Sequence, residues 1–130
     1  MLQPQEVVVG KLLPTLRARV AQILLESYHL KQVEIAKLLG ITQAAVSHYN
    51  TRSRGLDREI MRLFPEIEGH AQELAGRIRG GIRKTEQIRA FNTMVDQMAK
   101  TERFCEYHKK IAGIDPGCDI CFPMQLKLPK

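Results

Sequence analysis

The spacing of apolar residues is the feature that most constrains the fold of this chain, because they recur every three or four positions along most of its length. Such spacing gathers apolar side chains on one face of an α-helix. It predicts an all-α protein with helices over residues 14–28, 32–39, 42–49, 56–63, 65–79 and 85–111. Residues 6–13 are open between a short helix and an extended arm, because three consecutive valines favour a strand and Gly10 interrupts either structure.

Composition and charge narrow the class of protein. The chain has 130 residues, 44% of them hydrophobic, and contains no apolar run of about 18 residues that would predict a membrane span. The opening MLQPQEVVVGKLLP lacks the basic segment and long apolar core of a secretory signal, so we expect a cytoplasmic protein. The net charge of +6 favours a polyanionic partner.

The most specific motif lies between residues 32 and 49, with the spacing Gln32-x3-Ala36-x3-Gly40-x5-Val46-x2-Tyr49. Ala36 is small where two helices would cross closely, Gly40 can take the left-handed conformation that ends a helix, and Thr42 can cap the next one. A rigid corner of this kind is what a helix-turn-helix protein uses to present its second helix to the major groove of DNA.

On these residues, the segment 14–64 resembles the helix-turn-helix domains of the lambda-repressor-like (Xre-type) class. The run EIAKLLGITQAAVSHY resembles a family of predicted archaeal transcriptional regulators. The resemblance covers about half of the chain. It implies a sequence-specific regulator that binds a double-stranded DNA operator through a recognition helix over residues 42–50. The residues expected at the DNA are Gln32, Thr42, Gln43, Ala44, Ser47, His48, Arg52 and Arg54.

The resemblance also distributes these residues over the DNA. Gln43, Ala44 and Ser47 would face the base edges, with His48 as a further candidate, while Gln32 matches a position that reaches the phosphate backbone. A Gln side chain can bridge N6 and N7 of adenine, a Ser hydroxyl can donate or accept, and an Ala methyl can contact thymine.

The positive charge lies mostly with this motif. Residues 1–64 carry nine basic and five acidic residues, which is +4 of the net charge of +6. Arg52 and Arg54 directly follow the recognition helix, where they could neutralise phosphates and make binding depend on salt.

A second motif brings together the three cysteines and one histidine, with the spacing Cys105-x2-His108-x9-Cys118-x2-Cys121. Cys105 and His108 project from one face of a helix, and Cys118 and Cys121 bracket a turn. Three thiolates and an imidazole fit a tetrahedral zinc site. An iron-sulfur cluster that senses redox state is the alternative metal group, and a metal-free thiol set is the third possibility.

These patterns predict four segments: an arm or short helix (1–13), the DNA-binding domain (14–64), a helical dimerisation or regulatory extension (65–111) and a Cys/His tail (105–130). The need to read two half-sites about 34 Å apart favours a homodimer. The length of the helix expected over 85–111, which has few partners within the chain, favours the same state.

Other functions fit the sequence less well. An antitoxin or transcription accessory factor would use the same fold to bind a protein partner. We do not expect an enzyme, because there is no Ser/His/Asp arrangement, phosphate-binding glycine loop or paired carboxylate site, and the Cys118/Cys121 pair lacks the strand-helix-strand pattern of a redox protein.

Overall fold

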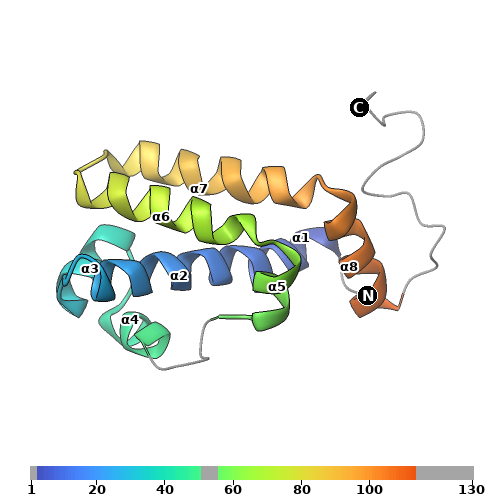
Figure 1. Cartoon of the computed structure of the whole chain (residues 1–130), viewed down its shortest axis with the longest axis horizontal. Helices are drawn as coiled ribbons and strands as arrows, with labels where there is room; N and C mark the ends of the chain where they lie inside the picture. Colours follow the sequence, from blue (N-terminus) through green and yellow to red (C-terminus); the bar gives the residue numbers. More distant parts are fainter. Residues whose placement is uncertain (1–2, 51–55, 114–130) are drawn as a thin grey trace.

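The computed structural model describes residues 3–50 and 56–113, and all regular secondary structure in them is helical, as the apolar spacing predicts (Figure 1). The elements are α1 (Pro4–Val7), the π-helix η1 (Val8–Leu12), α2 (Leu13–Glu26), α3 (Gln32–Leu39), α4 (Gln43–Asn50), α5 (Arg58–Leu63), α6 (Glu66–Arg79), α7 (Lys84–Ala99) and α8 (Glu102–Ala112).

The N-terminal segment is helical, which decides the question left open for residues 6–13. The backbone stays in the right-handed helical region from α1 through η1 into α2. The sequence predicted a helix that begins at Pro14. In the structure Pro14 lies inside a helical segment that begins earlier. Proline has no N–H to donate, and the wider π turn just before it takes up the irregularity. Burial of Val7 and Leu12 outweighs the preference of valine for strands.

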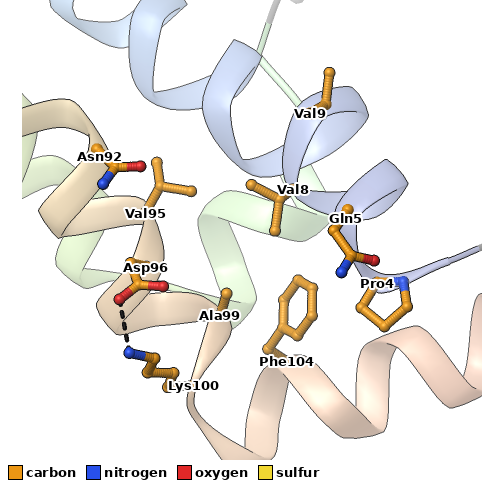
Figure 2. A pocket seen from close by; sticks show the side chains of 10 residues that line it. All are labelled: Pro4, Gln5, Val8, Val9, Asn92, Val95, Asp96, Ala99, Lys100 and Phe104. Atoms are coloured by element: carbon orange, nitrogen blue, oxygen red, sulfur yellow. Dashed lines mark ion pairs between the residues drawn. The ribbon is translucent and has the colours of Figure 1, made fainter. Parts of the chain in front are cut away.

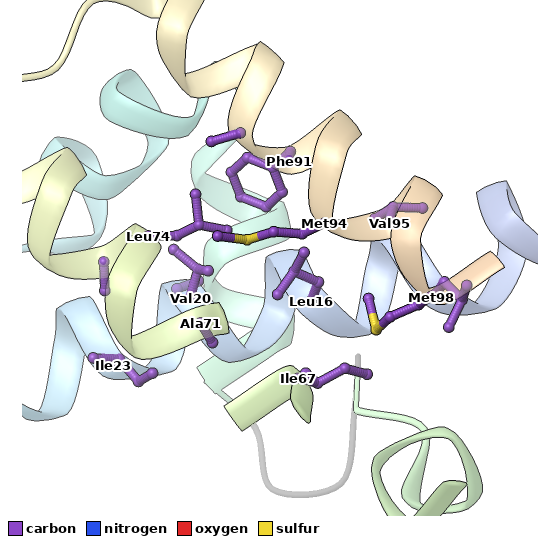
Figure 3. Packing of buried hydrophobic residues seen from close by; sticks show 14 of the residues in the cluster. Leu16, Val20, Ile23, Ile67, Ala71, Leu74, Phe91, Met94, Val95 and Met98 are labelled. Atoms are coloured by element: carbon purple, nitrogen blue, oxygen red, sulfur yellow. The ribbon is translucent and has the colours of Figure 1, made fainter. Parts of the chain in front are cut away.

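The core is built around α2, which contacts η1, α3, α4 and α6. The apolar stripe of α6, whose spacing fits either a core or a subunit interface, is buried within the chain: Ile67, Ala71, Leu74 and Ile78. Figure 3 shows side chains of α2, α6 and α7 meeting in one layer. The buried cluster runs from Val7 to Tyr107. The cluster includes residues on both sides of position 64/65, where we expect the DNA-binding domain to end. The two expected segments therefore share one core, and their division stays a prediction about their roles.

The prediction of a single helix over residues 85–111 is wrong, because α7 ends at Ala99 and α8 begins at Glu102. Thr101 makes the break: its hydroxyl donates to the carbonyl of Met98 at 2.7 Å, and its Oγ1 accepts the amide hydrogen of Phe104 at 3.2 Å. One side chain thus satisfies the end of one helix and the start of the next.

Because of this break, α7 and α8 both pack against other helices of the same chain. Arg103 of α8 donates to the carbonyl of Leu63 at 2.9 Å, forms an ion pair with Glu66 at 2.6 Å and lies over the ring of Phe64. Phe91, Val95 and Met98 of α7 are buried within the chain, whereas Ile88 is 69% exposed. The length of an unpartnered helix therefore no longer argues for a homodimer.

Candidate nucleic-acid interface

Helices α3 and α4 meet at a tight turn whose chemistry is the one the sequence predicts. Gly40 has φ 67°, in the left-handed region, and the amide of Ile41 donates to the carbonyl of Ala36 at 3.0 Å. Thr42 then starts α4, since its Oγ1 accepts the amide hydrogen of Ala45 at 3.0 Å and its carbonyl accepts that of Val46 at 3.2 Å. Both ends of the turn are satisfied by local hydrogen bonds.

The inner side of this corner is packed into the core. Ile35 and Val46 are fully buried and Ala36 is 8% exposed, so the small side chain lies where the two helices approach. Leu39 and Ile41 are half-buried against the same cluster. Because α4 contacts both α2 and α3, its position follows from buried apolar contacts on two sides.

The outer side of α4 presents polar and small residues to solvent. Gln43, Ala44, Ser47 and His48 are all exposed, as is Thr42 at the start of the helix. Gln32, at the start of α3, is half-buried. The structure thus places the four expected base-reading residues on one accessible face.

A chain of polar contacts that the sequence analysis missed fixes the far end of α4. Gln22 of α2 is 8% exposed, and its Nε2 donates to the carbonyl of Tyr49 at 3.0 Å. Its Oε1 accepts from Arg19 at 3.3 Å, and Arg19 donates through two nitrogens to the carboxylate of Glu68, at 2.7 and 3.1 Å. The network connects α6 through α2 to the last turn of α4.

This network has an electrostatic signature. The hydrogen bond from Arg19 lowers the pKa of Glu68 against the opposing effect of burial, and the same bond raises the pKa of Arg19. The only sequence signal was a glutamine in the apolar run from Val20 to Leu25.

A second missed contact joins α7 to the α3 end of the corner. The Nζ of Lys84 donates to the carbonyls of Lys37 and Leu38, at 2.6 and 2.7 Å. These carbonyls belong to the last turn of α3, where the regular helical hydrogen bonds end. A cation at a helix C-terminus also interacts favourably with the helix dipole. No local pattern in the sequence predicts these contacts, because Lys84 lies 47 positions after Lys37 and 46 positions after Leu38.

Half of the expected metal ligands fall in the described part of the chain. Cys105 and His108 lie on α8, three positions apart, and are 7% and 2% exposed. Cys118 and Cys121 lie outside the described residues, as do Arg52 and Arg54 of the expected DNA interface. Within residues 3–50 and 56–113, no three His, Cys, Asp or Glu side chains are grouped so that they could hold a metal ion.

Two open apolar grooves lie side by side between the N-terminal helices and α7. The larger, about 440 Å³, is bordered by α1, η1, α7 and Phe104 of α8 (Figure 2). The second, about 340 Å³, shares Val8, Val9, Asn92 and Val95 with it and extends to Ile88 and Leu39. Val9 is 65% exposed and Ile88 is 69% exposed at their borders.

Comparisons with protein families, curated proteins and solved structures gave no significant match to this chain. Among the helices that the structure describes, none has both the length and the apolar character needed to cross a membrane.

Proposed function

We propose that this protein is a transcriptional regulator that inserts α4 into the major groove of double-stranded DNA. The observation that carries the proposal is the exposure of Gln43, Ala44, Ser47 and His48 together on one face of a helix whose opposite face is buried. The α3–turn–α4 corner with its left-handed Gly40 is the arrangement that a lambda-repressor-like helix-turn-helix requires.

The side chains on this face suit base readout. Gln43 lies at the start of α4, from which a recognition helix contacts base edges, and Ser47 follows one turn later. An amide can bridge adenine N6 and N7, and a hydroxyl can pair with several bases. Specific readout needs a helix that keeps its orientation, and the Gln22 hydrogen bond to Tyr49 supports this at the far end of α4.

The proposal extends to a homodimer and a metal-organised tail. Two copies would place two recognition helices on successive half-sites, and the grooves beside Val9 and Ile88 offer an apolar face for this association. Cys105 and His108 on α8, with Cys118 and Cys121, would hold zinc, or an iron-sulfur cluster in a redox-sensing regulator.

Selection of DNA sequences from a random pool tests the base-reading role. The wild-type protein should enrich a defined motif, and Gln43→Ala and Ser47→Ala should each relax the preference at one or two positions, a loss of about 1–3 kcal/mol per base contact. Glu73→Gln, on an exposed position of α6, is the control and should enrich the wild-type motif. The proposal is contradicted if the wild-type protein enriches no motif, or if both α4 variants enrich the wild-type motif. Co-purification of a stoichiometric protein partner, without DNA binding, favours the antitoxin or accessory-factor alternative.

A further inference from the structure

Salt bridges neutralise the positive charge of this protein unevenly. Of the sixteen Lys and Arg side chains in residues 3–50 and 56–113, eight form an ion pair with a carboxylate. These pairs lie mainly along α2, α5, α7 and α8. The remaining eight have no such pair within the described residues. Six of them lie at two places: on α3 or just before it, and from the last turn of α6 to the first residue of α7.

We call these six residues the basic end: Lys31, Lys37, Arg77, Arg79, Arg83 and Lys84. All six are exposed. Figure 1 shows that α3 and the α6–α7 turn lie at the same end of the molecule, whereas α8 lies at the other end and α5 lies nearer to α8 than to α3. The contact of Lys84 with the last carbonyls of α3 connects the two segments directly. Over residues 31–40 and 76–84, Glu34 is the sole acidic residue.

Two of these cations are ordered by neutral partners, which leaves their charge uncompensated. The guanidinium of Arg79 lies over the ring of Tyr28, 5.2 Å from its centroid. Lys84 donates to two backbone carbonyls. A ring face or a carbonyl positions a cation without cancelling it, whereas a carboxylate does both. Two of the six charges of the basic end are therefore held in place at the surface.

From this arrangement we infer that the basic end binds the phosphate backbone of double-stranded DNA, beside the bases read by α4. The inference rests on the proposed function, because α3 joins the basic end to α4 through the turn at Gly40. Phosphate contacts position a protein on the duplex without reading sequence. They release counterions, so each contact steepens the dependence of affinity on salt. The α6–α7 turn would thus supply the non-specific part of binding and the α4 face the specific part.

The test compares two pairs of charge-neutralising substitutions in the full-length protein. Arg77→Gln with Arg83→Gln removes two charges from the basic end. Arg58→Gln with Lys110→Gln removes two exposed charges from α5 and α8, away from the basic end. Binding is measured by fluorescence anisotropy across a salt series, on a random-sequence duplex of about 30 base pairs, roughly three helical turns.

We expect the basic-end pair to bind roughly tenfold more weakly near physiological salt, with a salt slope shallower by about two units, and the control pair to bind like wild type. Arg77→Lys with Arg83→Lys should restore binding, because the charge is retained. Circular dichroism should show equal helix content in all four proteins, since each changed side chain is exposed.

Equal effects of the two glutamine pairs overturn the inference, because net charge alone would then explain the loss. So does unchanged DNA binding by the basic-end pair, or loss of binding to phosphatidylserine vesicles with DNA binding intact. Failure here can be told from failure of the proposed function. An unchanged selected motif in Gln43→Ala and Ser47→Ala removes base readout, whereas an unchanged salt slope in the basic-end pair removes only the phosphate surface.

Discussion

At the scale of single residues, the orientation of the candidate recognition helix depends on side chains that carry no recognition chemistry. Gln22 is buried in α2 and donates to the backbone of α4, and Arg19 connects it to Glu68 on α6. A buried glutamine that lost its partners would cost free energy, so the network favours one placement of the helices. Its weakest point is Glu68, whose side chain is 45% exposed.

Neutralising Glu68 should lower stability in a pH-dependent way. The bond from Arg19 lowers the pKa of Glu68 in the folded protein, so the ionised carboxylate stabilises the fold above the ordinary glutamate pKa. That contribution is lost as the pH falls through the lowered pKa. Glu68→Gln should therefore unfold more easily than wild type at pH 7, by roughly 0.5–1 kcal/mol for a partly exposed pair, and the difference should shrink toward pH ~3.

Urea unfolding at both pH values measures this difference. Glu73→Gln is the matched control, because Glu73 is exposed on the same helix and forms no ion pair within the described residues. A constant difference between Glu68→Gln and wild type at the two pH values would show that the ion pair with Arg19 is not its source.

At the scale of helices, the sequence predicted what local chemistry determines. Gly40 and Thr42 define the turn between α3 and α4, and both behave as their residue types indicate. The break at Thr101 was missed, although Glu102 interrupts the apolar rhythm there, because apolar residues resume at Phe104 and only the cap separates the two helices. Lys84 and Gln22 act over long sequence separations, which no local pattern encodes.

Helix α8 contains two of the four residues that we expect to bind a metal ion. Cys105 and His108 share one of its faces, and both are buried among the described residues. If they form a site with Cys118 and Cys121, protein purified without oxygen should be colourless and contain about one zinc per chain, and Cys118→Ser should lose the metal. Elemental analysis and a visible spectrum measure both properties.

The other outcomes decide between the alternatives for α8. Iron with a brown colour would favour the iron-sulfur cluster over zinc. Wild-type protein without any metal would leave Cys105 as an apolar core residue. Cys118→His is the matched control for Cys118→Ser, because imidazole is also a zinc ligand, and this variant should keep the metal.

At the scale of the whole molecule, one helical body carries the exposed face of α4 that we propose reads bases, the basic end and an apolar face. The two grooves between η1 and α7 share a wall, and Val9 and Ile88 project at their borders. A twofold interface places the same patch on both copies, so a face with both apolar projections and apolar hollows can complement itself. The second groove also reaches Leu39 of α3, which brings this face close to the candidate recognition corner.

The wild-type protein should accordingly be a dimer in sedimentation velocity experiments, and Ile88→Glu should be a monomer, because association would bury an unpaired carboxylate. Thr93→Glu adds the same charge at an exposed position of α7 that borders neither groove, and should remain dimeric.

The monomeric variant should keep its affinity for one half-site but lose most of its affinity for two half-sites about 34 Å apart, because the second contact is no longer linked to the first. A dimeric Ile88→Glu would move the interface away from this face, and a monomeric wild type would leave each chain to read a single half-site.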